Sequence, residues 1–587
     1  MNPYRPIMKQ FSTGMLLALL LLALPAMAQD TDQADAIAEP GDTPTTFENP
    51  DLVAQYLQTI TAEDLASHLY LFASDFFEGR ETSARGQKLA AHYLAAQYRK
   101  MGVMPMGTME TEDSRSPLAY FQPFPLYESA FDKAVLTFGD QKHVFGGPES
   151  DGSFYSMFGG AGMQTGSIVF AGYGIGDDEL GYNDFAAMEA AGIDMTGKWV
   201  MMLADEPMAN AETSLLPTED NALSPWTTGR FNKLRAFFGG DGAAPAGLLI
   251  VGDLSPRGES VASQAKAQAA ASGQGVGSLS LDPPSGDGRR GRFPTVLTVS
   301  AELASALLGR DVTQVKAEID QTLNPVVFES DIALTAEVSN KTGEVSSENV
   351  VAFIEGSDPM LKDEYVVISS HYDHVGMRAG EGDTIFNGAD DDGSGTVTVL
   401  EIAEAFAKAK EDGFGPRRSV IFLNVSGEEK GLLGSRYYTD VDPIVPLEQT
   451  VTNLNIDMIG RIDPTHPDEN SEYVYIIGSN LVSQELHDIN IRSNETFGSK
   501  VQLHERFNSK DDPNQFYRRS DHWNFGKHNI PFIFFFTGTH DDYHGVDDEP
   551  DKIEYERMAK IAHVIFATAW QVANQDTRPV VSGTGFN

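Results

Sequence analysis

The sequence predicts an α/β protein with a mostly parallel, doubly wound sheet and helices on both faces of that sheet. Four short apolar runs, rich in β-branched and aromatic residues, have the character of strands that are buried on both sides. They are residues 365–368, 419–423, 451–456 and 532–536. Between them, apolar residues recur with helical spacing, as at Val399, Ile402, Ala403 and Phe406. Alternating strands and helices are typical of such sheets, whose binding sites lie beyond the carboxyl ends of the strands.

Composition narrows the chemistry that such sites can carry. The chain has 587 residues, enough for more than one domain, and 41% of them are hydrophobic, so substantial cores can form. Cysteine is absent, which excludes disulfides and thiolate chemistry. A bound metal must therefore be held by histidine and carboxylate ligands, which suits zinc, manganese or a similar ion.

The chain is strongly acidic. Its formal net charge is −43, from 85 Asp plus Glu against 42 Lys plus Arg. Such a field disfavours nucleic acid and anionic membranes as partners, and it favours cationic or amine-bearing ligands. A second interpretation stays open, in which the acidic surface only keeps an exported protein soluble. The sequence does not predict an oligomeric state.

The first 28 residues have the pattern of a secretory signal peptide. Arg5 and Lys9 form a basic start, residues 15–24 an apolar core, and residues 26–28 a small-x-small cleavage site. We therefore expect an exported protein, periplasmic or secreted, with no membrane span after cleavage. An uncleaved anchor is the alternative, although the apolar core is short for a span. Residues 29–54 are acidic and poor in large apolar side chains, and we expect them to be flexible.

The remaining chain divides by character. Residues 55–154 are expected to belong to the main domain, with a helix that Thr61 caps and that runs to about Ser74, a second helix over 83–101, and short strands over 120–145. Residues 155–305 are expected to form an inserted β-rich domain with strands at 167–170, 199–203, 247–251 and 295–299. It either shapes access to the site or is a spacer. Residues 306–575 are the main domain proper, closed by a helix over 553–572, and 576–587 are a loose tail.

Potential metal ligands follow the predicted strands. His371, in HYDH, can bind a metal through one ring nitrogen while Asp373 accepts a hydrogen bond from the other ring N–H. His374, in the same motif, is interpreted as a neighbour without a metal role. The motif GADDDGSG places three aspartates, residues 390–392, directly before a helix. The helix dipole accounts for one acid there but not for three, which favours a bound cation.

Two further strands end in acids. Glu428 and Glu429 point in different directions after one strand, so that one can bind a metal while the other moves a proton. Asp457 ends the next apolar run, where a buried charge needs a partner. His544 lies in a polar loop after the last strand. These ligands exceed the needs of one ion and would fit two ions about 3.5–4 Å apart.

As a set, these motifs resemble the zinc aminopeptidases of peptidase family M28, in the variant that carries a protease-associated (PA) domain. The resemblance covers about residues 55–575 and includes SDFFEGR at 74–80 and FAGYGIGDDELGYNDF at 170–185. It implies two zinc ions bridged by Asp391, of which one is also bound by His371 and Asp457 and the other by Glu429 and His544. It further implies a cis peptide bond after Asp391, Glu428 as the general base and Asp373 as the partner of His371. Residues 520–522, SDH, resemble a family stretch to which we assign no role.

The function implied by the resemblance is an exported metallo-aminopeptidase. It would hydrolyse the N-terminal residue from peptides with a free N-terminus, using a water activated by two zinc ions. Three alternatives stay open. A carboxypeptidase of the same family would need a basic pocket, for which the candidates are Arg436, Arg461, Arg518 and Arg519. A glutaminyl cyclase would use one zinc on the same scaffold, and a non-catalytic receptor-like protein is disfavoured because Glu428 and the ligand set are intact.

Overall fold

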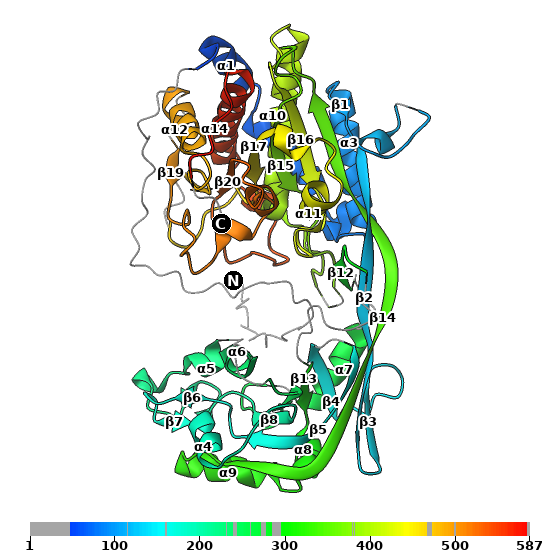
Figure 1. Ribbon diagram of the computed structural model, residues 1–587, viewed down its shortest axis with the longest axis vertical. Coiled ribbons are helices and arrows are strands. Elements are labelled where there is room, and N and C mark those ends of the chain that lie inside the picture. The colour runs from blue at the N-terminus through cyan, green and yellow to red at the C-terminus, as the bar shows by residue number, and fades with distance from the viewer. Residues whose placement is uncertain are drawn as a thin grey trace, which may run out of the picture. The chain divides into compact units, whose positions relative to one another are not determined.

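A computed structural model gives the fold of the chain (Figure 1). It describes residues 47–113, 115–158, 161–229, 232–238, 244–258, 260–271, 277–283, 295–378, 380, 382–466, 472–497 and 501–583. The predicted signal peptide, residues 29–46 of the acidic segment and residues 584–587 of the tail lie outside the described residues. The chain divides into two compact units. Among the described residues, the insert unit falls within 129–273 and 284–342, and the main unit falls within 47–128, 274–283 and 343–583.

The main unit contains a mixed, mostly parallel sheet, as predicted. Its strands follow the order β19-β18-β20-β17-β15-β16-β14. The parallel pairs are β15 with β16 and β17, β17 with β20, and β18 with β19, whereas β14 and β18 run antiparallel to their neighbours β16 and β20. The strands are β1 Met104–Pro105, β2 Phe121–Phe138, β12 Ser278–Ser280, β14 Val327–Ile354, β15 Tyr365–His371, β16 Ser419–Val425, β17 Thr450–Ile456, β18 Tyr473–Ile477, β19 Gln502–His504 and β20 Phe532–Phe536. By their residue ranges, β2 and β14 contribute to both units.

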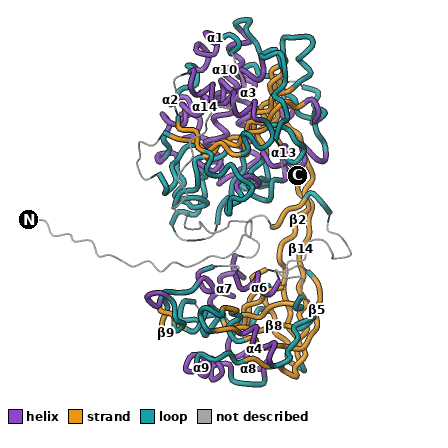
Figure 2. Tube along the Cα trace, turned by 60° about the vertical axis from the view of Figure 1, so that its left-hand side comes forward, coloured by secondary structure: helices purple, strands orange, loops and turns teal. Residues whose placement is uncertain are grey.

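Helices cover both faces of this sheet (Figures 1 and 2). They are α1 Pro50–Leu57, α2 Ala62–Phe72, α3 Arg85–Lys100, α10 Gly395–Glu411, α11 Leu433–Arg436, α12 Gln484–Thr496, α13 His522–Gly526 and α14 Tyr555–Asn574. Alternate residues of β15 face the helices on opposite sides of the sheet. Val366 and Ile368 belong to the core to which α1, α2, α3, α10, α12 and α14 contribute, whereas Val367 belongs to a separate core with Phe525 of α13. The prediction of helices on both faces is confirmed.

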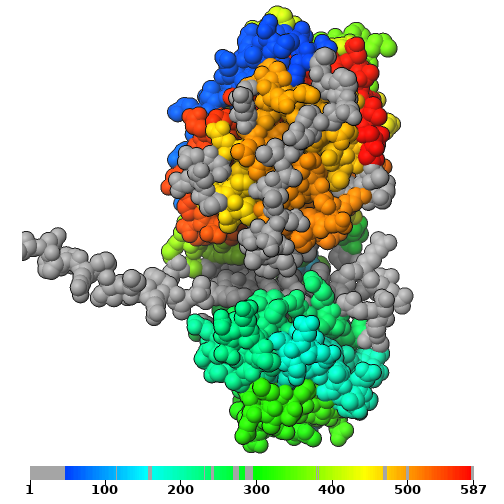
Figure 3. Space-filling view, turned by 90° about the vertical axis from the view of Figure 1, so that its left-hand side faces the viewer, coloured from blue at the N-terminus to red at the C-terminus, as the bar shows by residue number. Residues whose placement is uncertain are grey.

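The N-terminal helices belong to the core of the main unit. Thr61 caps α2 by accepting a hydrogen bond from the main-chain N–H of Asp64 at 3.1 Å, so the predicted capped helix is confirmed. The predicted flexible segment 29–54 is too long at its C-terminal end, because α1 begins at Pro50 and buries Val53 against the core. The main-chain N–H of Glu48 also donates to the side chain of Gln571 in α14. In Figure 3 the blue N-terminal residues and the red C-terminal residues both lie at the surface of this unit.

The insert unit is also built around a parallel sheet. Strands β5, β8, β11 and β13 pair in parallel, with β4 and β14 antiparallel at the edges. The elements are β3 Gln141–Phe145, β4 Phe154–Phe158, β5 Gly162–Ala171, β6 Gly176–Asp177, β7 Tyr182–Asn183, α4 Asp184–Ala190, β8 Trp199–Leu203, β9 Met208–Asn210, β10 Thr213–Ser214, α5 Pro225–Thr228, α6 Asn232–Phe238, β11 Gly247–Val251, α7 Val261–Ala271, β13 Thr295–Val299, α8 Ala301–Leu308 and α9 Val312–Thr322. The four strands predicted in this region are confirmed.

Two features of the insert unit differ from the prediction. Helices α4 and α6 cover one face of the sheet and α7, α8 and α9 the other, although only strands were expected here. The compact unit is also larger than the predicted insertion 155–305, because it takes in residues 129–154 and 306–342. The reason is that β14 continues as one strand from Val327 and that α8 and α9 pack on the same core as β5. Likewise β2 is one strand of 18 residues where short strands were expected.

The described part of the C-terminal tail is attached to the main unit. Asp576 accepts a hydrogen bond from Arg417 at 2.7 Å, and the main-chain N–H of Val580 donates to Glu485 at 2.9 Å. No helix within the described ranges has both the length and the apolar character that crossing a membrane requires.

Candidate metal centre

The predicted ligands lie beyond the carboxyl ends of the parallel strands of the main unit. His371 is the last residue of β15, and Asp457 directly follows β17. Glu428 and Glu429 come after β16, and His544 lies in the loop after β20. Because these strands are parallel, their ends meet at one edge of the sheet. The fold therefore brings together side chains that are far apart in the sequence.

The three aspartates of the triplet have three different roles. They lie in the turn Ala389–Ser394, which leads directly into α10, and the peptide bond between Asp391 and Asp392 is cis, as the resemblance implied. Asp390 accepts a hydrogen bond from the main-chain N–H of Gly460 at 2.6 Å. Asp392 accepts from the main-chain N–H groups of His371, Gly395 and Met458, and so joins the ends of two strands to the start of α10. Asp391 is the member whose carboxylate faces the other ligands.

Asp391 presents its two oxygens to two different groups of side chains. Oδ1 lies 3.3 Å from Nε2 of His371, and the same nitrogen lies 3.6 Å from Oδ1 of Asp457. Oδ2 lies 3.0 Å from Nε2 of His544, which is 3.2 Å from Oε2 of Glu429. The other four predicted ligands therefore surround the carboxylate of Asp391, in the two groups that the resemblance implied.

His374, which the sequence analysis left without a metal role, belongs to the second group. Its Nδ1 lies 2.9 Å from Oε1 of Glu429 and 3.9 Å from Oδ2 of Asp391. His374, Asp391 and Glu429 offer ligand atoms that lie within 4.8 Å of one another, as do His371, Asp391 and Asp457. Glu429 is thus contacted by a histidine on each of its two oxygens.

Glu428 differs from the other acids of the site. Its Oε2 lies 3.9 Å from Nε2 of His371, and its side chain is 12% exposed, whereas that of Glu429 is 4% exposed. Burial raises the pKa of Glu428 well above its usual range, an effect that His371 opposes and Glu429 reinforces. Asp521, whose pKa burial raises to about 7, adds a further negative charge near Glu428 and accepts a hydrogen bond from Ser435. Glu428 is therefore the carboxylate that can exchange a proton at the edge of the site.

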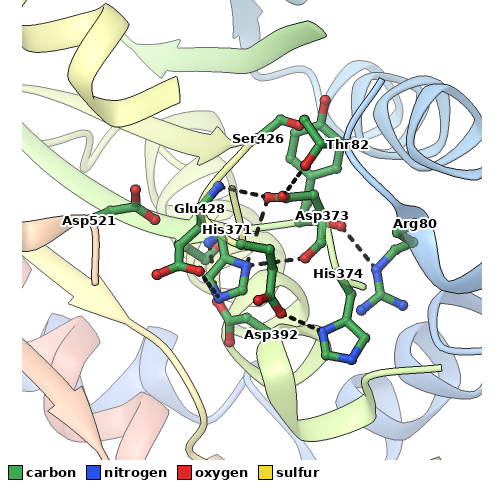
Figure 4. Close-up of polar contacts among 12 residues, drawn as sticks. Arg80, Thr82, His371, Asp373, His374, Asp392, Ser426, Glu428 and Asp521 are labelled. Carbon is green, nitrogen blue, oxygen red and sulfur yellow. Dashed lines mark hydrogen bonds and ion pairs between the residues drawn. The ribbon is translucent and has the colours of Figure 1, made fainter. Parts of the chain in front are cut away.

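Asp373 contacts His371 through a different atom from the one predicted. Nδ1 of His371 lies 3.1 Å from the main-chain carbonyl of Asp373 and 3.9 Å from its carboxylate. The carboxylate instead accepts a hydrogen bond from Thr82 at 2.6 Å and one from the main-chain N–H of Glu428 at 3.3 Å (Figure 4). Asp373 still orients the imidazole, but its carboxylate holds the segment that carries Glu428.

Arg80 is a supporting residue that the sequence analysis did not identify. It is fully buried, and its guanidinium donates to four main-chain carbonyls, those of Phe72, Tyr372, Asn387 and Gly388. Three of these carbonyls belong to the motif segments: Tyr372 lies in HYDH, Gly388 begins GADDDGSG, and Asn387 directly precedes it. Figure 4 shows Arg80 on the opposite side of the site from Asp521. The sequence signal for Arg80 was the motif SDFFEGR, which ends at this residue and is part of the family resemblance. The motif alone did not indicate a role for Arg80.

The donor atoms fit a cation. Within the described residues, both ring nitrogens of His374, Oδ2 of Asp391 and Oε1 of Glu429 are buried and make no hydrogen bond of normal geometry, although they lie close together. Burial of this many carboxylates is costly without a counter-charge. Histidine nitrogens and carboxylate oxygens, with no cysteine available, are ligands that zinc accepts. The residues present therefore fit zinc.

The histidines and carboxylates of the site stabilise each other's charged forms. Burial alone would lower the pKa of His371, but the carboxylates of Glu428 and Asp457 raise it well above its usual range. Burial alone would raise the pKa of Asp391, but His371 and His544 hold it well below its usual range. The site therefore strongly favours positive charge among its carboxylates.

Comparison with known proteins places these observations in a family context. Residues 349–569 match the model of peptidase family M28. The chain is 28% identical over 166 residues to aminopeptidase YwaD of Bacillus subtilis, a match that covers 28% of this chain and 32% of the relative. It is 34% identical over 110 residues to the probable glutamate carboxypeptidase LAMP1 of Arabidopsis thaliana, covering 19% of this chain and 14% of the relative. The matches thus span a third or less of these relatives.

The fold is shared with a solved aminopeptidase from Aneurinibacillus sp. strain AM-1. The two structures superpose with a TM-score of 0.50 at 16% sequence identity, over 91% of this chain and 99% of the other. This likeness confirms the predicted fold class. The region that matches the family model includes all five predicted ligands, Asp373 and Glu428, but not Arg80 or Thr82.

Proposed function

We propose that this chain is a zinc-dependent aminopeptidase that binds two zinc ions and removes the N-terminal residue from peptides. The observation that carries the proposal is the position of Asp391, whose two oxygens face separate groups of ligands. One ion would be held by His371, Asp391 and Asp457, and the other by Asp391, Glu429 and His544. His544 is the proposed ligand because its Nε2 lies 3.0 Å from Asp391 and 3.2 Å from Glu429, whereas Nδ1 of His374 lies 3.9 Å from Asp391 and contacts the other oxygen of Glu429.

Zinc, when bound, supplies Lewis acidity that makes water a stronger nucleophile and polarises the scissile carbonyl. The other steps belong to the chain. Glu428 takes the proton of the attacking water and delivers it to the nitrogen of the leaving amine. Its raised pKa and partial exposure suit this exchange. Asp373 and Asp392 keep the ligand segments in place through their bonds to main-chain N–H groups. The acidic surroundings favour a substrate with a cationic N-terminus.

Two further proposals concern the rest of the chain. Residues 1–28 have the pattern of a signal peptide, so we propose export to the periplasm or the extracellular space. The resemblance at residues 170–185 supports the proposal that the insert unit is a PA domain.

The reaction is tested by mass spectrometry on zinc-loaded protein, with peptides offered in pairs that have a free or an acetylated N-terminus. Release of single N-terminal residues from the free peptides alone is the expected result. Loss of residues from the carboxyl end would support the carboxypeptidase alternative, and cyclisation of N-terminal glutamine alone would support the cyclase.

The role of Glu428 is tested by two neighbouring substitutions. Glu428→Gln should lower kcat by about 10²–10⁴-fold, because it removes the proton acceptor. It should leave the zinc content unchanged, since Glu428 is not a proposed ligand. Glu429→Gln is the matched control and should lose zinc, as measured by elemental analysis after dialysis. Retained turnover in Glu428→Gln would refute the assignment.

A further inference from the structure

A pocket beside the proposed metal ligands contains one arginine. His371, Asp391, Glu428 and Asp457 line it on one side. Its other lining includes the side chains of Phe516, Arg519, Phe534, Phe536 and Tyr543. The pocket therefore combines a strongly acidic wall, an aromatic wall and a single guanidinium.

Of the four arginines considered as carboxylate-binding candidates, three are engaged elsewhere. Arg436 forms an ion pair with Asp282 at 3.1 Å, and Arg461 forms one with Asp542 at 3.1 Å. Arg518 is exposed and donates a hydrogen bond to the side chain of Gln515. None of these three lines the pocket.

Arg519 is different because it lines the pocket and has no carboxylate partner in the described part of the chain. Its guanidinium carbon lies 4.8 Å from the centroid of the Phe516 ring, and its main-chain N–H donates to the carbonyl of Phe516 at 3.1 Å. Its charge influences the pKa values of Tyr543 and Asp512, but it forms no ion pair with Asp512. In a chain with a net charge of −43, an arginine without a paired acid is available for a ligand.

The chemistry of such a site is specific. A guanidinium is planar, and its forked N–H donors match the two oxygens of a carboxylate. The contact with the Phe516 ring favours a fixed position for the guanidinium of Arg519. Asp391, Glu428 and Asp457 also line the pocket, but among the described residues none of them forms an ion pair with Arg519, and each lies near His371 instead. A negatively charged group of the substrate is therefore the partner that the pocket lacks.

We propose that Arg519 binds a carboxylate of the substrate close to the scissile bond, so that the favoured substrates are dipeptides and not long peptides. The proposal rests on the proposed aminopeptidase function and adds a substrate class to it. In a dipeptide the free carboxylate lies within one residue of the scissile bond, a distance of at most about 3.6 Å along the chain. A short peptide can therefore reach both the metal ligands and Arg519, since both line the same pocket. The aromatic wall of Phe534, Phe536 and Tyr543 favours an apolar side chain on such a substrate.

The test compares Leu-Leu with its C-terminal amide, which differs only in the charge of that terminus. We expect the zinc-loaded protein to cleave the acid with a kcat/KM about 10- to 100-fold above that of the amide, because a charge-assisted pair is lost in the amide. In Arg519→Gln the ratio should fall to about 1. Arg518→Gln, a change at the exposed neighbour, should keep the ratio. A ratio near 1 in the unmodified protein, or an unchanged ratio in Arg519→Gln, overturns the proposal.

Two further substrates identify the source of the carboxylate. Efficient cleavage of Leu-Asp amide would show that an acidic side chain next to the scissile bond can replace the terminal carboxylate. A pentapeptide that loses its C-terminal residue, with dependence on Arg519, would support the carboxylate site while refuting the aminopeptidase. Equal cleavage of dipeptides and pentapeptides at the N-terminus would overturn the preference for dipeptides.

A binding measurement separates failure of this proposal from failure of the proposed function. Calorimetry on zinc-loaded Glu428→Gln measures Leu-Leu and its amide without turnover. We expect Leu-Leu to bind more tightly than its amide, and we expect this difference to disappear in the double variant Glu428→Gln/Arg519→Gln. That result supports the carboxylate site even if no peptide is cleaved. Equal affinity for the acid and the amide overturns the proposal whatever the activity.

Discussion

Replacing Arg80 with methionine should destabilise the main unit, because it removes a buried cation that ties two ligand segments together. The guanidinium donates to the carbonyls of Tyr372 at 2.9 Å, Asn387 at 2.7 Å, Gly388 at 2.8 Å and Phe72 at 3.2 Å. Methionine preserves much of the apolar packing but offers no donor.

The size of the effect follows from the acceptors that are left behind. Four buried carbonyls lose their partner, and each costs about 1–3 kcal/mol if nothing replaces it. The total is smaller than the sum of these four costs, because the surrounding main chain can relax and methionine carries no charge that must be buried. In other proteins, removal of one partner from a buried ion pair costs about 3–5 kcal/mol. Burial lowers the pKa of Arg80 to about 10, with Asp548, Asp391 and other acids opposing that shift, so the group carries its charge at neutral pH. We expect a loss of about 3–5 kcal/mol in the free energy of unfolding of the main unit.

The measurement must report on the main unit alone, because a chain with two compact units need not unfold in one step. Hydrogen exchange followed by mass spectrometry in peptides from α10 and α14 reports the opening free energy of that core. Arg85→Met is the control, since Arg85 is 70% exposed in its ion pair with Glu78 and its loss should be nearly neutral. Arg80→Lys should fall between the two, because it keeps the charge but not the forked donors. A change below about 1 kcal/mol in Arg80→Met would refute the reasoning.

Two other substitutions test neighbouring parts of the site. Thr82→Val removes the hydroxyl that donates to Asp373 at 2.6 Å, so zinc affinity measured by chelator competition should fall by about 10-fold; unchanged affinity would show that Asp373 needs no such partner. His522 is buried against Phe532 and Phe534, and this burial lowers its pKa to about 3. Below about pH 6.5 the histidine of the unfolded chain therefore binds a proton, whereas His522 of the folded chain stays neutral. Its contribution to stability is therefore complete above about pH 6.5 and should fall by about 2 kcal/mol between pH 6.5 and pH 5. His522→Phe should flatten this part of the stability curve, and an equally steep curve would contradict the assignment.

The candidate ligands His371 and Asp457 could be predicted from the sequence because they follow uninterrupted apolar strands, the same pattern that predicts the fold class. Asp391 was predicted instead from three consecutive aspartates before a helix, and its bridging role from the family resemblance. The helices of the insert unit were missed for a related reason. Helices α4 and α6 have seven residues each, and α7 is rich in alanine, so none has a clear apolar stripe.

Other features depend on main-chain geometry that the sequence does not display. The acceptors of Arg80 are all main-chain carbonyls, so no complementary side chain in the sequence indicates them. The main-chain N–H of His374 donates to the carbonyl of Arg80, a contact between distant parts of the chain, and the side chain of His374 contacts Glu429. The conformation of residues 371–373 likewise brings the carbonyl of Asp373, and not its carboxylate, to His371.

The packing of α2 and α3 on the main core also has a consequence for the order in which the protein is synthesised and folds. These helices end at Phe72 and Lys100, whereas β14, whose residues share their core, contributes to that core only from Val350. At 5–20 residues per second, a ribosome needs roughly 10–50 s to make the intervening chain. During that time Leu65, Leu69 and Leu94 have no sheet to cover them, and Arg80 has none of its acceptors beyond Phe72. The polypeptide that carries Arg80 is therefore synthesised first, and its apolar residues lack their partners until the strands of the main sheet follow.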